Sequence, residues 1–243
     1  MAAPPQKTVP PERLAENLAR VRAALLEATA EARRDPRTVR LVAVTKYVGA
    51  AEVRELLKLG VTEFGENRIQ PAHAKIVELA AEMKAANARW RMIGHLQTNK
   101  ARNALEDFAA LDAIDSLYLL EALAKEARKL NLKRVPCLAE INVSGEAQKY
   151  GLKPEELEAF LRRASGIPEL ALEGLMCMAP YNDDAENVSR PVFKALRELF
   201  ERANAGRWYA QPLTELSMGM SSDFKVAIAE GATLVRIGSA LFE

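Results

Sequence analysis

The order of apolar and polar positions along the chain predicts a regular alternation of helices and strands. Apolar residues first recur at helical spacing from about residue 11 to residue 34, and Asp35-Pro36 ends that pattern. The segment 41–46 is instead an apolar run rich in β-branched residues, as in a buried strand. Further strands are expected at 63–67, 90–96, 111–115, 137–143, 172–179, 215–221 and 234–237, with helices between them at 51–59, 69–86, 99–108, 117–130, 154–165, 187–204 and 222–230.

Eight strands that alternate with helices predict an α/β fold, a single (β/α)8 TIM-type barrel with an extra N-terminal helix before strand one. An open doubly wound sheet is the alternative. The barrel is favoured because no Gly-x-Gly-x-x-Gly sequence follows the first strand, where a dinucleotide-binding fold would carry it. No helix is expected after strand eight, so the first helix could fill the eighth outer position. The barrel domain is assigned to residues 12–243 and a flexible, Ala/Pro-rich tail to residues 1–11.

The overall composition argues against several classes of partner. The 34 basic and 33 acidic residues nearly cancel, which disfavours a nucleic-acid or anionic-membrane binder. Cys137 and Cys177 lie far apart in apolar runs, so we expect buried, reduced thiols and neither a disulfide framework nor a metal site. No stretch reaches the roughly 18 apolar residues of a membrane span. The start of the chain lacks the apolar core of a signal peptide, so a cytoplasmic protein is expected.

Polar side chains gather where the predicted strands end, which is where barrels place their chemistry. Packing inside a barrel does not require such endings, so the pattern indicates a ligand site. In strand order these residues are Lys46, Asn67, His95, Asp115, Asn142 with Ser144, Met178, Ser221, and Arg236 with Gly238 and Ser239.

Lys46 is the most informative of these residues. It follows five apolar or β-branched residues, and burial favours a neutral amine, which can attack an aldehyde. The alternative is a lysine that extends its head to solvent from a strand end. The loops after strands seven and eight change the balance, because barrels often bind phosphate there. Ser221 could add a hydroxyl and Gly238 allows close backbone approach, although Ser222 and Asp223 could simply cap a helix.

Six segments together resemble one known family. They read AVTK at 43–46, FGEN at 64–67, IGHLQTNK at 93–100, GLMCM at 174–178, LSMGMS at 216–221 and VRIGS at 235–239. On these residues the chain resembles the YggS/PROSC family of pyridoxal phosphate homeostasis proteins, from about residue 12 to the end. Two departures occur: Arg-Ile-Gln-Pro at 68–71, where the family usually has an aromatic residue, Val, Gln and Glu, and an end at Glu243, where the family tends to continue through Gly.

The resemblance implies a barrel similar to the N-terminal domain of alanine racemase, with pyridoxal 5′-phosphate (PLP) as a Schiff base on one lysine. It also implies a monomer. An arginine near the pyridine nitrogen would keep that nitrogen unprotonated and weaken the ring as an electron sink. The implied contacts are Lys46 for the Schiff base, Ser221, Gly238 and Ser239 for the phosphate, Arg236 for the pyridine nitrogen, and Asn67 beside the ring; Met220, which otherwise serves barrel packing, is a further expected ring contact.

Three functions compete for this site. The first is a carrier that binds PLP in vitamin B6 homeostasis and hands it transiently to apo PLP-dependent enzymes, without strong catalysis of its own. The second is a PLP-dependent, racemase-like enzyme on the same barrel. The third is a lysine Schiff-base aldolase for a phosphorylated sugar, which leaves Arg236 unexplained.

Features of the site favour the carrier over the racemase. Racemase-like catalysis needs a second acid/base, normally a tyrosine from a separate C-terminal domain for which this chain has no room. Tyr181 is the one tyrosine that could swing over the site. His95 is interpreted as a hydrogen-bonded positioning residue, so no catalytic residue is assigned. The enzymes that would receive the cofactor are not identified by the sequence.

Overall fold

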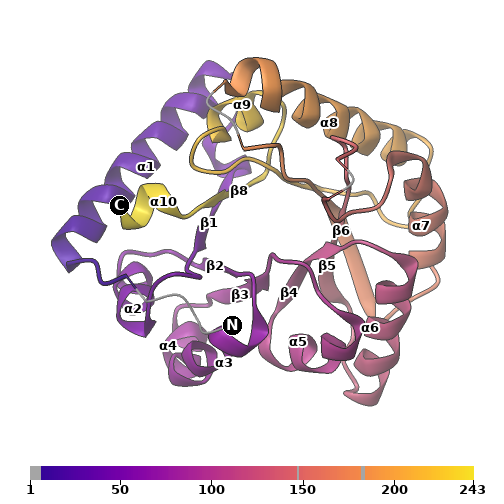
Figure 1. The fold of residues 1–243 in the computed structure, drawn as a ribbon, viewed down its shortest axis with the longest axis horizontal. Coiled ribbons are helices and arrows are strands. Elements are labelled where there is room, and N and C mark those ends of the chain that lie inside the picture. Colours follow the sequence, from indigo (N-terminus) through magenta and orange to yellow (C-terminus); the bar gives the residue numbers. More distant parts are fainter. Residues whose placement is uncertain (1–6, 147, 182–183) are drawn as a thin grey trace.

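The computed structural model describes residues 7–146, 148–181 and 184–243, and its strands form the predicted barrel. Each strand runs parallel to its neighbours in sequence, and the last strand pairs with the first, which closes the ring (Figure 1). The TIM-type barrel is therefore confirmed over the open sheet. The strands are β1 (Arg40–Val44), β2 (Glu63–Glu66), β3 (Arg89–Met92), β4 (Ala110–Ile114), β5 (Val135–Glu140), β6 (Leu170–Met176), β7 (Glu215–Ser217) and β8 (Leu234–Ile237).

Helices surround the barrel on its outside (Figure 1). The α-helices are α1 (Pro11–Glu31), α2 (Ala50–Lys58), α3 (Ile69–Glu78), α4 (Ala80–Ala85), α5 (Ala101–Asp107), α6 (Leu117–Lys129), α7 (Leu157–Ala164), α8 (Arg190–Ala205), α9 (Phe224–Ala229) and α10 (Ser239–Phe242). Short 3-10 turns are η1 (Pro36–Thr38), η2 (Thr98–Lys100) and η3 (Pro154–Glu156), and a π-helical turn, η4 (Ala185–Ser189), precedes α8.

The first helix fills the eighth outer position, as expected. It contacts both α2 and α9, and thus bridges the start and the end of the barrel. The expectation that no helix follows strand eight is wrong, because α10 follows β8 and packs on α1. Asn17 on α1 donates a hydrogen bond from Nδ2 to the carbonyl of Leu241, at 2.9 Å. Four residues are too few to show a helical period in the sequence, which is why α10 was not predicted.

The predicted elements all occur, but their ends differ from those expected. Several strands are shorter at their carboxyl ends: the fifth ends at Glu140 and the seventh at Ser217. The apolar pattern continues past these points, because the loops that follow are themselves partly buried. The helix expected at 69–86 is two helices that meet at Leu79, whose side chain is fully buried.

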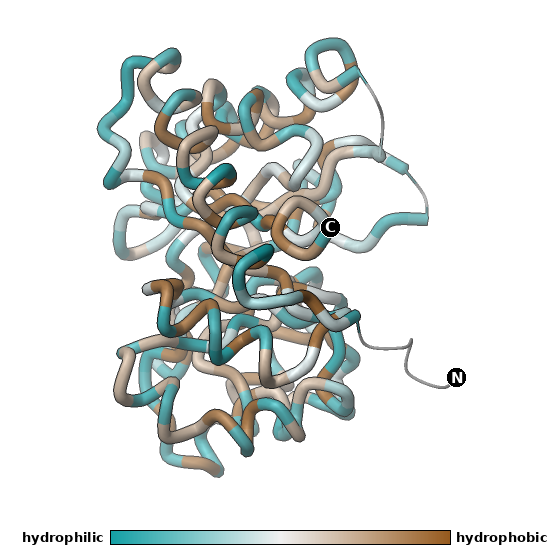
Figure 2. Tube along the Cα trace, turned by 90° about the vertical axis from the view of Figure 1, so that its left-hand side faces the viewer, coloured by the Kyte–Doolittle hydropathy of each residue, from teal (hydrophilic) through white to brown (hydrophobic). Residues whose placement is uncertain are grey.

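Two apolar layers form the core. The larger layer lies between the barrel and its helices, and the alternating hydrophobic and hydrophilic colours along the helices in Figure 2 reflect their amphipathic sequences. A smaller cluster comprises Val42, Ala113, Leu138, Met176 and Leu234, which come from five different strands. Since side chains alternate along a strand, this second cluster marks the residues that point into the barrel.

The amino-terminal end of the barrel interior is filled by ion pairs. Arg91 and Asp112 are both fully buried, and the guanidinium donates to both carboxylate oxygens at 2.7 Å. Glu63 joins this pair through Arg91, at 3.2 Å, and also bonds Arg89. Arg40 continues the network to Glu215, at 2.6 Å. These charges compensate one another. The amino-terminal end of the barrel interior, the barrel floor, is therefore closed by this network of ion pairs.

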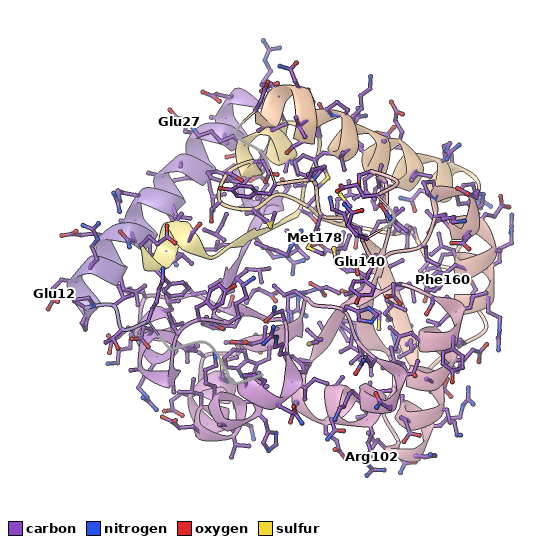
Figure 3. All side chains as sticks on the ribbon, viewed as in Figure 1. Glu12, Glu27, Arg102, Glu140, Phe160 and Met178 are labelled. Atoms are coloured by element: carbon purple, nitrogen blue, oxygen red, sulfur yellow. The ribbon has the colours of Figure 1, made fainter. Side chains whose placement is uncertain are left out.

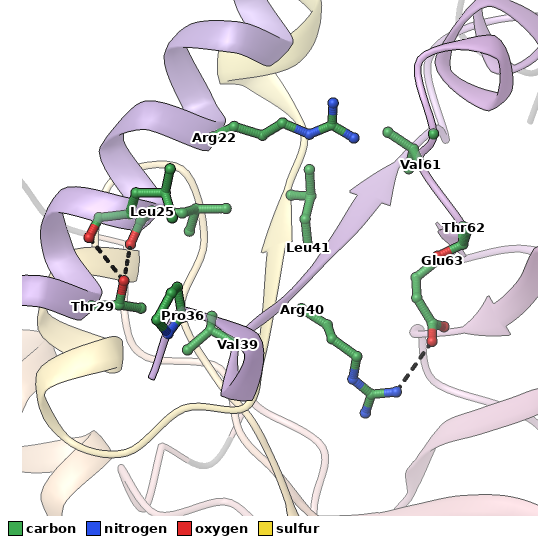
Figure 4. A pocket seen from close by; sticks show the side chains of 12 residues that line it. Arg22, Leu25, Thr29, Pro36, Val39, Arg40, Leu41, Val61, Thr62 and Glu63 are labelled. Carbon is green, nitrogen blue, oxygen red and sulfur yellow. Dashed lines mark hydrogen bonds and ion pairs between the residues drawn. The ribbon is translucent and has the colours of Figure 1, made fainter. Parts of the chain in front are cut away.

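A hollow of about 350 Å³ lies beside α1 near the same end (Figure 4). Leu25, Val39, Leu41 and Val61 line it, and Arg40 forms an ion pair with Glu63 at its edge. Functional residues of such barrels lie at the opposite, carboxyl-terminal face. The functional site is therefore expected at the other end of the strands.

The described part of the N-terminal tail contacts the barrel. Residues 1–6 of the predicted tail lie outside the described residues. The backbone N–H of Lys7 donates to the carbonyl of Tyr47, at 2.7 Å, and Lys7 forms an ion pair with Glu243. The start and end of the described chain thus meet beside the turn that follows β1.

Candidate functional site

The closed barrel brings the predicted site residues to one rim. Lys46 follows β1, Asn67 follows β2, Ser221 follows β7, and Gly238 follows β8. Because all eight strands are parallel, their carboxyl ends lie at the same face. The sequence-predicted residues are therefore neighbours around a single opening, whereas their contact with a cofactor stays a prediction.

A buried ion pair between Lys75 and Glu66 fixes the backbone of the turn that carries Lys46. Lys75 on α3 donates from Nζ to the carbonyls of Thr45 and Val48, at 2.8 and 3.0 Å, and to the carboxylate of Glu66. The same Glu66 oxygen accepts a hydrogen bond from Thr45 Oγ1, at 2.7 Å. The backbone on both sides of Lys46 is thereby fixed, so its side chain leaves the rim in a defined direction.

The Lys46 amine itself is half-buried and has no hydrogen-bond or ion-pair partner among residues 7–146, 148–181 and 184–243. Its Nζ lies 5.0 Å from the centre of the Tyr47 ring, within the range of a cation–π contact. Lys75 of the same region, by contrast, uses its amine entirely for the protein. Lys46 is thus the lysine at the end of β1 that is available to a ligand.

The loops after β7 and β8 form a cradle of backbone donors. Ser221 Oγ accepts long hydrogen bonds from the N–H groups of Gly238 and Ala240, both at 3.4 Å. Asp223 holds the preceding turn by accepting from the N–H of Met220, at 2.6 Å. A cap-like role for Asp223 is thus part of the structure, but it does not consume the Gly238 and Ala240 donors.

Gly238 leaves the backbone of this turn uncovered by a side chain. Its φ is −121° and its ψ is −77°, and an added Cβ would meet Val44 Cβ at 3.5 Å, an ordinary contact. A glycine here lets a ligand approach the backbone closely. An anion can replace the Ser221 hydroxyl as the acceptor of the Gly238 and Ala240 N–H groups, which belong to the turn at the start of α10.

Arg236 is buried, with 4% of its surface exposed, and its position inside the barrel is fixed. It stands two residues after Leu234 of the inward-facing cluster, so its side chain points inward. Its Nη1 donates to Ser217 Oγ at 2.7 Å, and its Nη2 donates to the carbonyl of Cys177 at 2.8 Å. Burial lowers the pKa of Arg236, while nearby Asp112 and other acidic groups oppose that shift.

The remaining predicted contacts differ in exposure. Asn67 and Met220 are half-buried at the rim, and Ser239 is exposed at the start of α10. The Asn67 backbone passes close to Gly94, where an added Cβ would lie 2.5 Å from the Asn67 carbonyl oxygen, so this approach requires glycine at 94. Their placement is compatible with ring and phosphate contacts, and no described residue hydrogen-bonds the side chain of Asn67 or Ser239.

Glu140 is a site residue that sequence reasoning missed (Figure 3). It ends β5 two positions after inward-facing Leu138, and only 3% of its surface is exposed. Burial raises the pKa of Glu140 to about 7, the charge of Asp115 adds to this shift, and Arg236 opposes it. The sequence signal for this residue is a carboxylate at the end of an apolar strand. Because the strand was predicted at 137–143, Glu140 fell inside it and was not recognised as a strand-end residue.

Asn142 and Ser144, expected at the rim after strand five, serve their own loop instead. Asn142 Nδ2 donates to the carbonyls of Glu146 and Lys149, and Ser144 Oγ donates to the Glu146 carboxylate. These bonds shape the loop, and they leave Glu140 as the polar residue of β5 that faces the opening.

His95 and Asp115 form a hydrogen-bonded pair at the rim. His95 Nδ1 lies 2.8 Å from Asp115 Oδ2, and the imidazole stacks on the Tyr150 ring with centroids 3.6 Å apart. This geometry agrees with a positioned histidine. Tyr181 is 87% exposed, so its ring lies in solvent and away from the interior.

Both cysteines are buried and free, as expected. Burial raises the pKa of Cys177 to about 12, and burial likewise raises the pKa of Cys137. The thiols therefore stay protonated at neutral pH and are poor nucleophiles. Among the described residues, no helix is long and apolar enough to cross a bilayer, and no group of three or more His, Cys, Asp or Glu side chains is placed to hold a metal.

Comparisons with known proteins agree with this geometry. Residues 11–243 match the family described as alanine racemase, N-terminal domain, so the fold and site define a barrel of that class. The chain is 42% identical over 229 residues to the pyridoxal phosphate homeostasis protein of Pseudomonas aeruginosa, covering 94% of each chain. It is 37% identical over 227 residues to the protein of that name from Aquifex aeolicus, covering 93% of this chain and 96% of the relative.

A solved structure adds a ligand to the comparison. PipY of Synechococcus elongatus PCC7942, determined with PLP bound, superposes with a TM-score of 0.79 at 35% identity, covering 95% of this chain and 100% of PipY. The chain belongs to the family of pyridoxal phosphate homeostasis proteins.

Proposed function

We propose that this protein binds PLP as a Schiff base on Lys46 and acts in vitamin B6 homeostasis in the cytoplasm. The observation that carries the proposal is that two features occur at one rim. They are a lysine after β1 without a hydrogen-bond partner among the described residues, and a cradle of backbone donors after β7 and β8. A lysine amine condenses with an aldehyde, and backbone N–H groups receive a phosphate. The PLP-bound relative PipY supports this choice of ligand.

The chain's own residues divide the binding of this cofactor among them. Ser221, Gly238 and Ser239 would hold the phosphate, and Lys46 the aldehyde carbon. Arg236, held by Ser217 and Cys177, would donate to the pyridine nitrogen without protonating it, because a guanidinium keeps its protons. Asn67 and Met220 would lie against the ring. When bound, the cofactor supplies an aldehyde and an electron-withdrawing ring.

The same residues favour a carrier over a catalyst. The Arg236 guanidinium would keep the ring a weak electron sink, and the exposed Tyr181 places no acid/base over the ring. A monomer that protects the aldehyde and passes PLP transiently to apo PLP-dependent enzymes uses all of these features. The His95–Asp115 pair favours a second candidate, a racemase-like enzyme, because it orients an imidazole at the opening.

Hydride reduction of the PLP-loaded protein tests the proposal. We expect one pyridoxyl group per chain, located on Lys46 by peptide mass spectrometry, because this amine lacks a partner within the protein. Lys46→Ala should abolish the label, whereas Lys100→Ala, a lysine in the turn after β3, should keep it. A label found mainly on Lys100 or Lys225 would refute the assignment.

Turnover of amino acids separates the two candidate functions. We expect racemisation, transamination and decarboxylation of ordinary amino acids by the loaded protein to be absent or far below typical enzyme rates, which are on the order of 1–1000 per second. Chiral chromatography of the products over hours provides the measurement. Steady turnover within the usual range would instead support the racemase-like enzyme.

A further inference from the structure

Glu140 is a buried carboxyl group that neither the predicted cofactor contacts nor the protein itself uses. Its side chain makes no hydrogen bond or ion pair with any described residue, although 97% of its surface is covered. Its oxygens keep a small contact with solvent at the opening, so they are available there as acceptors for a ligand. Glu140 points into the opening at which Lys46 and Arg236 also end.

Three titratable groups from three other elements face this carboxyl. Asp115 follows β4, Arg236 lies on β8, and the Cys177 thiol follows β6. The Arg236 donors are directed to Ser217 and to the Cys177 carbonyl, so the guanidinium does not bond the carboxylate. The thiol stays protonated. Lys46 ends at the same opening but forms no ion pair with a described residue, and His95 bonds one oxygen of Asp115. Both carboxyl groups therefore keep a free acceptor oxygen.

We propose that Glu140, together with Asp115, binds the ammonium group of a small primary amine at the opening of the barrel. An ammonium carries three donors and no acceptor, which suits two carboxyl groups with free acceptor oxygens. An anion would be repelled by both. The stacked rings of His95 and Tyr150 stand beside Asp115 and provide an aromatic wall for the rest of the ligand.

The role of such a subsite rests on the proposed function, because an amine held there would stand near the aldehyde that Lys46 receives. The subsite itself consists only of the chain's own residues. It can therefore be tested in full-length protein without added PLP, and its outcome does not depend on whether Lys46 takes the cofactor.

Binding of an ammonium should change the titration of Glu140. With a pKa of about 7, this carboxyl group is roughly half protonated at neutral pH. A bound positive charge favours the ionised form, so the amine should lower the midpoint and release protons to the buffer. A half-buried carboxyl whose pKa is also raised by burial, Glu173, lies on β6 towards the opposite end of the barrel and provides an internal control.

Carbon-13 NMR of the protein labelled at the glutamate side-chain carboxyl carbons measures this directly. We expect one resonance to titrate near pH 7 and to be absent in Glu140→Gln. Propylammonium chloride should lower the midpoint of this titration by about one pH unit. Such a shift means that propylammonium binds tenfold more tightly when Glu140 is ionised. The reference is sodium chloride at equal ionic strength. The neutral probe 1-propanol and the Glu173 resonance should show no such shift.

A midpoint that propylammonium leaves unchanged, or that 1-propanol moves equally, overturns the proposal. The key measurement uses the wild-type protein, so it does not depend on the folding of a variant. Asp115→Asn gives a second test in which Glu140 is retained: the midpoint without amine should fall, and the shift caused by propylammonium should shrink. A full shift in that variant would contradict the role of Asp115.

Discussion

Gly238→Leu should weaken the binding of PLP about 100-fold or more while changing the affinity for unphosphorylated pyridoxal only slightly. The leucine side chain would enter the space that a phosphate needs beside the N–H groups of Gly238 and Ala240. Loss of two charge-assisted hydrogen bonds, each worth about 1.5–3 kcal/mol, corresponds to roughly this factor. Absorbance titrations with both compounds provide the two dissociation constants.

The protein should tolerate this substitution. A Cβ at 238 makes only an ordinary contact with Val44, so the side chain has room beside the barrel. Gly166→Leu is the matched control, because Gly166 is an exposed residue after α7 with room for a side chain. It should leave both affinities unchanged. Equal losses for PLP and pyridoxal in Gly238→Leu would show that the phosphate binds elsewhere.

Asp112→Asn should reduce the free energy of unfolding by about 3–5 kcal/mol. Burial alone would lower the pKa of Arg91, but the charges of Asp112 and Glu63 raise it above the ordinary value, so the guanidinium stays charged inside the barrel. Removing its bidentate partner leaves a buried charge with incomplete compensation, and breaking such pairs has this magnitude. Urea unfolding followed by circular dichroism measures the loss.

An exposed pair of the same chemistry provides the control. Asp35 and Arg37 also form a bidentate contact, but both side chains are exposed to solvent, by 42% and 89%. Asp35→Asn should therefore cost less than about 1 kcal/mol. If Asp112→Asn were no more destabilising than Asp35→Asn, the polar network of the barrel floor would not be a major source of stability.

The fold could be predicted from the sequence because its signals are local. Each strand shows its own apolar run, and each long helix shows its own period, as in 41–46 and in α1. What local patterns do not show is where a strand stops pairing, since that depends on the neighbouring strands. The register shift between β5 and β6 and the short α10 are properties of the assembled barrel.

The site was predicted less completely, for a related reason. Lys46, Ser221 and Gly238 stand out because each follows an apolar strand and has a type that suits the chemistry. Lys75 gave no such signal, because a lysine on a helix is usually solvent-exposed. Only the fold places its amine beside the turn after β1. Glu140 was hidden by a strand end placed three residues too late.

The joining of β8 to β1 has a consequence for the time course of synthesis and folding. The lysine that ends β1 and the donors that follow β8 are separated by most of the chain, and α1 has its partner α10 only in the last residues. Contacts of such sequence separation form slowly, because the loop between them must first close. On a ribosome, β1 must wait for β8 to emerge before the two can pair. The rim that carries the proposed cofactor contacts is therefore incomplete in the nascent chain until the ring closes.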